Sequence, residues 1–183
     1  MHYNLKIKTM KPTRIIAKIL FYITRLLGAL YLLTAAHTAI AFAFNTSSLM
    51  VYDKDGVQRF KIMYPFTQKP FLLGDYNPLY IVFEFTGILF CYGMFLWLLS
   101  SVFNTFSQKK LFTEKGYKSL KWFYLFNLIT PPLALFLFGL YYRIEEPISM
   151  IAFLHCISGI FAFFLAAIFK QGVNLQNEQD LII

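Results

Sequence analysis

Long apolar runs separated by short polar segments dominate this chain. Four runs cover about residues 26–44, 80–103, 120–142 and 148–169. Each is near the ~20 residues that a helix needs to cross about 30 Å of hydrocarbon. The segments between them are too short for a separate soluble domain of ordinary size. The pattern therefore predicts an all-α fold, a four-transmembrane-helix bundle that forms a single membrane domain over residues 1–183.

The segment 45–79, between the first two runs, carries a different pattern. Two runs rich in Val, Tyr, Phe and Ile, 49–52 and 57–64, flank the turn sequence 53–56, which ends in Gly56. Alternating strand formers around such a turn predict a β-hairpin, with Gly56 at a positive φ. The prolines that follow predict an irregular chain up to the second helix; they are Pro65, Pro70 and Pro78. A lone hairpin is marginal in water, so we expect this one to pack against helix ends or a partner.

The charges indicate which side of a membrane each segment faces. The chain is 58% hydrophobic and carries a formal charge of +8. Twelve of its 17 Lys and Arg residues precede the first run, lie between the second and third runs or at the start of the third, or follow the fourth. The positive-inside bias therefore predicts cytoplasmic termini and a cytoplasmic loop 104–119. The basic excess then meets anionic lipid headgroups, and direct nucleic-acid binding is not expected.

The cytoplasmic segments, loop 104–119 and tail 170–183, contain recognisable short motifs. Thr113 is placed to cap the third helix, and Glu114 faces the positive end of its dipole. In the middle of that helix, Pro131 and Pro132 predict a kink near Thr130. The first 25 residues are not expected to be a cleaved signal peptide, because the apolar run that follows extends to Phe44 without a cleavage site.

Two of these motifs resemble a known family. The run Leu111-Phe112-Thr113-Glu114, and the ending from Gly172 through Leu175, Glu178, Asp180 and Leu181 to Ile182, are similar to signatures of the bacterial membrane proteins grouped as domain of unknown function 2975. The resemblance implies a four-helix membrane protein without an established activity, often encoded beside a small helix-turn-helix regulator. It supplies no catalytic residues. Two features depart from the family pattern. The external loop, residues 45–79, is wider, and isoleucine stands at position 182, where threonine is more usual.

Ionisable residues inside apolar runs are functional candidates, because a charge at membrane depth is costly. Here they are His37, Glu84 and His155, with Cys156 adjacent. If the first, second and fourth helices face one another, the three side chains can converge near the outer third of the bundle. Such a cluster could ligate a haem iron or a divalent metal, or could relay protons. Alternatively, each side chain has a structural role, hydrogen-bonded to a neighbouring polar group.

The end of the chain suggests a binding peptide. Leu181 and Ile182 are apolar residues beside the acidic Glu178 and Asp180. They are expected either to fray or to dock into a groove on a cytoplasmic partner or on loop 104–119. In the docked form, Thr113 and Glu114 belong to the same docking region.

No hydrolase, metalloprotease or phosphate-binding motif occurs in the sequence. We therefore expect a non-enzymatic protein of the bacterial inner membrane, without a cofactor or a bound metal. Its partners would be the bilayer and a protein, either a cytoplasmic helix-turn-helix regulator or another membrane subunit. The alternative is a small transporter, or a haem- or metal-binding redox protein, that uses His37, Glu84 and His155.

Overall fold

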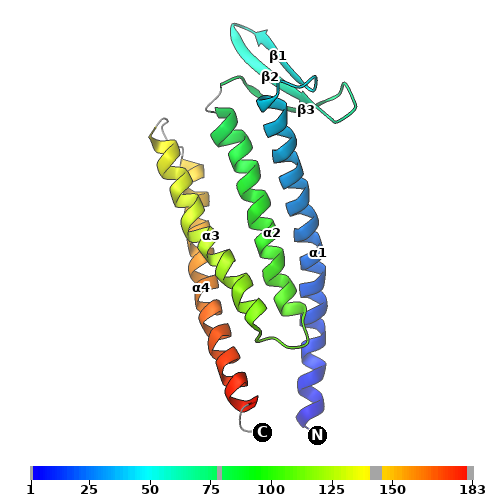
Figure 1. Cartoon of the computed structure of the whole chain (residues 1–183), viewed down its shortest axis with the longest axis vertical. Coiled ribbons are helices and arrows are strands. Elements are labelled where there is room, and N and C mark those ends of the chain that lie inside the picture. Colours follow the sequence, from blue (N-terminus) through cyan, green and yellow to red (C-terminus); the bar gives the residue numbers. More distant parts are fainter. Residues whose placement is uncertain (1, 78–79, 141–145, 181–183) are drawn as a thin grey trace. The chain divides into compact units, whose positions relative to one another are not determined.

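The structure is a computed structural model. It describes residues 2–77, 80–140 and 146–180, without the side chains of residues 2–11, 80, 82–84, 179 and 180. The elements follow in the order α1 (His2–Ala43), β1 (Leu49–Lys54), β2 (Val57–Met63), β3 (Pro70–Asp75), the π-helical segment η1 (Tyr80–Gly87), α2 (Ile88–Ser107), α3 (Glu114–Gly139) and α4 (Glu146–Asp180) (Figure 1). Two compact units result. The helical unit comprises Met1–Leu26 and Phe95–Ile183, and the sheet unit comprises Leu27–Met94.

Four helical segments are long and apolar enough to cross a membrane, as the sequence predicts. They are Pro12–Ala43, Phe85–Ser107, Glu114–Gly139 and Glu146–Glu178. The four helices extend beyond the predicted runs, most of all α1, which begins at His2, and α4, which continues to Asp180. The thickness of hydrocarbon limits the apolar run and not the helix, so polar turns can continue outside it. Residues 141 and 142, predicted as the end of the third run, lie outside the described residues.

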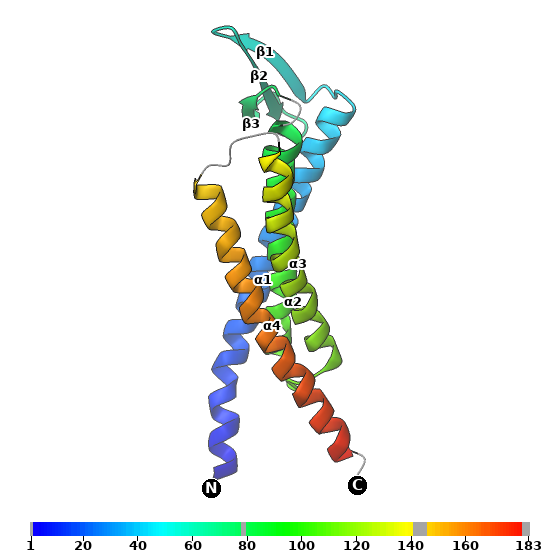
Figure 2. The same ribbon diagram turned by 90° about the vertical axis from the view of Figure 1, so that its left-hand side faces the viewer.

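The core of the helical unit lies where α4 crosses α3, and Val102 of α2 also belongs to it (Figure 2). The buried residues of α3 recur every three or four positions, at Gly116, Leu120, Phe123 and Asn127. On α4 they follow the same period and are mostly small: Ala152, Gly159, Ala162, Ala166, Phe169 and Val173. A methyl group at Gly159 would lie 2.8 Å from Cγ of Leu128, so the backbone of α4 lies directly against α3. Small residues permit this close packing without water to drive it.

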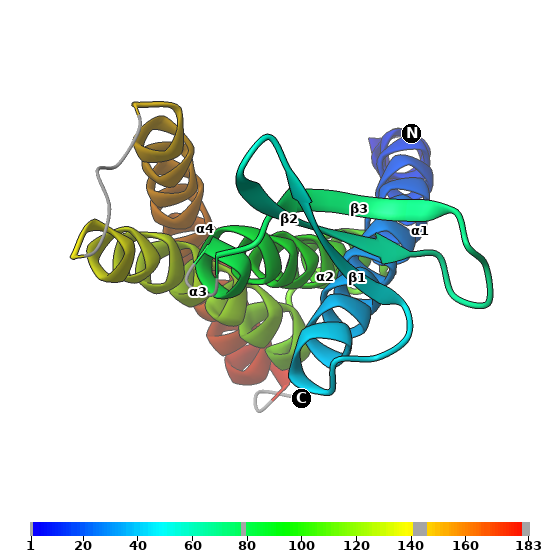
Figure 3. The ribbon, with the colours of Figure 1, turned by 90° about the horizontal axis from the view of Figure 1, so that it is seen from above.

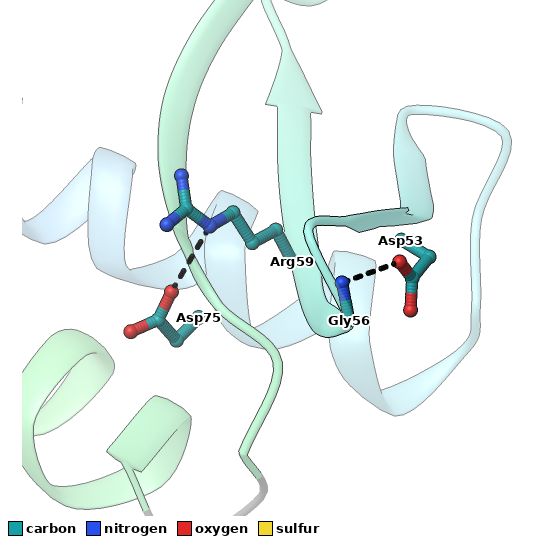
Figure 4. A network of polar contacts seen from close by, with 4 residues as sticks. All are labelled: Asp53, Gly56, Arg59 and Asp75. Atoms are coloured by element: carbon teal, nitrogen blue, oxygen red, sulfur yellow. Dashed lines mark hydrogen bonds and ion pairs between the residues drawn. The ribbon is translucent and has the colours of Figure 1, made fainter.

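The predicted hairpin is present in the sheet unit. Strands β1 and β2 pair antiparallel, and Lys54 opposite Val57 leaves a two-residue turn. Its residues Asp55 and Gly56 have φ of 58° and 75°, the left-handed values of a type I′ turn. The amide N–H of Gly56 donates to the Asp53 carboxylate over 3.1 Å, which closes the turn (Figure 4). The prediction that Gly56 takes a positive φ is confirmed.

A third strand, β3, occupies part of the segment predicted to be irregular, so that prediction was wrong. β3 pairs antiparallel with β2 in the sheet order β1-β2-β3. β3 is the last strand in this order and therefore lies at an edge of the sheet. Pro70 is its first residue. A proline is tolerated there because an edge position does not require its missing N–H. An ion pair between Arg59 and Asp75, 3.5 Å apart, links the other end of the two strands (Figure 4).

One face of the sheet is buried against helix ends, as expected for so small a sheet (Figure 3). Phe60 and Ile62 alternate along β2 with outward residues, and both are fully buried. They pack with Ala41 of α1 and Ile81 of η1. The ring of Phe60 also meets Phe42 edge to face, with centroids 4.9 Å apart. This apolar contact supplies the burial that a three-stranded sheet lacks by itself.

Candidate functional site

The two family-like motifs meet in the helical unit. Phe112, from the first motif, packs directly against Gly172, from the second. The contact is so close that a methyl group added at Gly172 would lie 2.5 Å from the Phe112 ring. The same ring meets Phe169 edge to face, with centroids 5.3 Å apart. Phe106 contacts Phe169 in the same way at 5.6 Å. An aromatic cluster thus joins the α2–α3 loop to the last turns of α4, and we call it the loop–tail junction.

Thr113 anchors the same loop to α3. Its extended backbone ends the loop, and its hydroxyl accepts a hydrogen bond from the Gly116 amide over 3.1 Å. The predicted N-cap is therefore confirmed. Glu114 occupies the first turn of α3, where a carboxylate interacts favourably with the helix dipole, and its side chain is exposed. The motif thus contributes a cap and an exposed acid next to the loop–tail junction.

The predicted docking tail continues α4 as a helix. Glu178 is exposed on this helix, and the chain is helical through Asp180. The side chain of Asp180 lies outside the described residues, as do Leu181 and Ile182 altogether. Docking of this tail onto loop 104–119 or onto a partner stays a prediction.

His155 forms a polar contact that crosses from α4 to α3. Its Nδ1 lies 2.7 Å from Oδ1 of Asn127, which is completely buried. Nδ2 of Asn127 donates to the carbonyl of Phe123 over 2.8 Å. This fixes Oδ1 as the acceptor, so His155 carries a proton on Nδ1 and donates it. The ring also packs edge to face on Phe95, with centroids 4.8 Å apart.

Asn127 was missed by the sequence reasoning, although two signals point to it. Asparagine in an apolar run needs a partner, because an unpaired amide is costly in hydrocarbon. In addition, Pro131 lies four residues later on the same helix and has no N–H to donate to the Asn127 carbonyl. The Asn127–His155 hydrogen bond therefore ties α3 to α4 where the backbone ladder of α3 is interrupted. The helix continues through Pro131 and Pro132 to Gly139.

His37 has a partner in the sheet unit. Its Nε2 lies 3.2 Å from the carbonyl oxygen of Met63, which can only accept, so His37 donates. Met63 stands at a shift in register between β2 and β3. Such a bulge leaves backbone groups outside the regular ladder, and one of them is used by His37. This contact holds the sheet to α1 beside the apolar face.

The third member of the predicted cluster, Glu84, lies in η1, and its side chain is outside the described residues. His37 belongs to the sheet unit and His155 to the helical unit, each with a hydrogen-bond partner in its own unit. The convergence of the three side chains stays a prediction. Within the part of the chain that the structure describes, no group of three or more His, Cys, Asp or Glu residues is arranged to hold a metal ion. Cys91 and Cys156 are free thiols, half-buried in α2 and α4.

The outward helix faces are apolar. Leu33, Phe153 and Phe161 are 67%, 66% and 68% exposed, and many other aliphatic and aromatic residues are similarly placed. Exposed apolar surface on this scale is typical of chains that face lipid. Together with four helices of sufficient length, it indicates a multi-pass membrane protein.

A more specific assignment comes from comparison with known families. The profile of the family described as "Protein of unknown function (DUF2975)" matches residues 61–183, and the chain belongs to this family. The match contains both motifs of the loop–tail junction and confirms the resemblance drawn from the sequence. The chain matches no curated protein and no solved structure.

Proposed function

We propose that this protein is a non-enzymatic membrane component that binds another protein at its cytoplasmic face. It resides in the bacterial inner membrane with both termini in the cytoplasm, as the distribution of Lys and Arg favours. The partner is a cytoplasmic helix-turn-helix regulator or another membrane subunit. The binding surface comprises loop 108–113, the first turn of α3 and the end of α4 from residue 174 onward.

The loop–tail junction is the observation that carries this proposal. Phe112 is seated on Gly172, so the loop and the end of α4 are fixed to each other before any partner arrives. Preorganisation of this kind lowers the ordering entropy that binding must offset. Beside the junction, Leu175 is 60% exposed, and Glu178, Lys109 and Lys110 are exposed as well. An exposed apolar residue, together with exposed charges of both signs, is suited to contact with a protein.

The alternative, a small transporter or a haem- or metal-binding redox protein, ranks second. It needs His37, Glu84 and His155 for ligation or proton transfer. The hydrogen bonds of His37 to Met63 and of His155 to Asn127 support a structural role for both imidazoles. Helix-to-helix bonds of this type stabilise membrane proteins without any catalytic purpose.

Truncation of the tail tests the proposal without disturbing the junction. A chain that ends at Gln176 keeps Gly172 and the buried Val173 but lacks residues 177–183. The matched control carries residues 177–183 in a shuffled order, with the same length and charge. Affinity capture from native membranes should recover the partner with the natural chain and at least about tenfold less with either variant, at equal amounts of membrane protein. Equal recovery with all three chains would overturn the docking role.

A further inference from the structure

A pocket of about 360 Å³ lies between α2 and α3 in the helical unit. Leu98 and Ser101 line it from α2. Four residues line it from α3: Lys115, Lys118, Ser119 and Trp122. This volume is within the usual range for sites that bind small molecules. Among these lining residues none is acidic, so the pocket has a net positive charge.

The α3 residues in this pocket follow helical spacing. Positions 115, 118, 119 and 122 are related by three, four and seven residues, so their side chains share one face of α3. The two ammonium groups come first, then a hydroxyl, then the indole. On α2, which approaches its end at Ser107, the hydroxyl of Ser101 comes three residues after Leu98. The pocket is therefore cationic near the α2–α3 loop, and aromatic and aliphatic farther along both helices.

A third cation is fixed beside the pocket. Nη2 of Arg25 donates to the hydroxyl of Ser101 over 3.3 Å. The guanidinium lies 3.9 Å from the centre of the Trp97 ring, in cation–π geometry. These two contacts hold the charge of Arg25 next to a residue that lines the pocket. A mobile surface arginine would not provide such a fixed field.

We propose that this pocket binds the headgroup of an anionic phospholipid. Lys115 and Lys118 pair with the phosphate, and Ser119 contributes hydroxyl contacts. The first part of the acyl chain lies along Leu98 and Trp122. Free phosphate would use the cationic end alone, whereas the apolar end of the pocket matches the tail of a lipid. Trp122 is 64% exposed, and tryptophan is enriched where headgroups meet hydrocarbon.

Two double substitutions separate a specific site from general attraction to anionic membranes. Lys115→Gln with Lys118→Gln removes two charges from the pocket. Lys109→Gln with Lys110→Gln removes two exposed charges from the loop, outside the residues that line the pocket. Both pairs are exposed lysines, so each variant is expected to fold. Purified full-length protein in zwitterionic detergent is titrated with phosphatidylglycerol or with phosphatidylcholine of the same acyl chains, and bound lipid is counted by native mass spectrometry.

The natural chain should bind one phosphatidylglycerol at least about tenfold more tightly than phosphatidylcholine, because each basic residue beside an anionic lipid contributes appreciably to the free energy of binding. The pocket variant should lose this preference, and the loop variant should keep it. The chain that ends at Gln176 should bind lipid like the natural chain, so failure of the partner proposal leaves this result unaffected. Equal loss in the two lysine variants would overturn the site. Displacement of the lipid by millimolar inorganic phosphate would overturn its assignment to a lipid.

Discussion

Asn127 carries a buried hydrogen bond between two helices of the helical unit. It is completely buried, and both polar atoms of its amide are used, one within α3 and one by His155 of α4. In a core of small and aromatic residues, such a polar pair can form in only one register of the two helices. Its contribution is therefore to specificity of packing as well as to stability.

We predict that Asn127 and His155 are energetically coupled. Asn127→Leu removes the acceptor of His155, and His155→Phe removes the donor while it keeps the ring contact with Phe95. The double-mutant cycle should give a coupling free energy of about 0.6–2 kcal/mol, as for hydrogen bonds between membrane helices. Unfolding of the purified protein in mixed micelles measures it. Additive free energies of unfolding for the two substitutions would contradict the pairing.

Some of the polar residues could be predicted from the sequence. Ionisable groups are conspicuous in apolar runs, so the sequence indicated His37 and His155. It did not indicate their partners, since a spacing along one helix does not specify which residue of another helix or strand it will meet. The Met63 carbonyl in particular has no sequence signal, because its availability arises from a register shift within the sheet.

At the scale of elements, the contact between the α2–α3 loop and α4 depends on a residue without a side chain. Phe112 occupies the space that a side chain at Gly172 would need. Thr113, the next residue, ends the loop by capping α3. The last two residues of the loop are consequently fixed, one against α4 and the other to α3, which explains why these residue types occur together in the two motifs.

Substitution of Gly172 should therefore destabilise the protein in a manner that depends on Phe112. Gly172→Ala forces the Phe112 ring to move and should cost about 1–3 kcal/mol, as for overpacked cores. In a Phe112→Ala background the same change should cost much less, because the obstructing ring is gone. Ala167→Gly, at an exposed position of α4, is the control for altered helix propensity. An equal cost of Gly172→Ala in both backgrounds would refute the contact.

The helices and the hairpin could be predicted from sequence because their signals are local: apolar length, a capping threonine, and a turn ending in glycine. Strand β3 could not. Three prolines in the segment favour irregular chain, but Pro70 falls at the first position of an outer strand, where its missing N–H does no harm. Whether a proline is tolerated depends on sheet order, which is not a local property.

At the scale of the whole molecule, the uneven distribution of basic residues bears on topology. Twelve of 17 Lys and Arg residues lie on the side that carries both termini and the α2–α3 loop in the proposed arrangement. The sheet unit contributes Lys54, Arg59, Lys61 and Lys69 to the opposite side, among acidic residues. Membrane insertion follows such asymmetry because basic segments are retained in the cytoplasm.

Cysteine labelling should report opposite sides for the sheet and for the end of α4. In a background with Cys91→Ala and Cys156→Ala, single substitutions Gln58→Cys and Asn174→Cys both replace exposed neutral amides. A membrane-impermeant maleimide added to spheroplasts should label Gln58→Cys at once and Asn174→Cys only after the membrane is opened. Immediate labelling of Asn174→Cys would contradict cytoplasmic termini.

The cluster of His37, Glu84 and His155 belongs to this scale too, because it requires three helices to turn particular faces toward one another. Loop lengths and apolar runs specify the order of helices in a chain, but they leave the rotation of each helix open. The local partners of the two histidines came from the structure, and sequence spacing alone could not have supplied them.

The length of α4 has a mechanical consequence. Its 35 residues extend about 52 Å at the helical rise of 1.5 Å per residue, against about 30 Å of hydrocarbon. In the proposed arrangement, roughly 20 Å of continuous helix therefore lie outside the hydrocarbon, in the headgroup region and beyond it. A continuous helix transmits both tilt and rotation along its length. A partner bound to the end of α4 would therefore be turned by any movement of the part of α4 that lies inside the hydrocarbon.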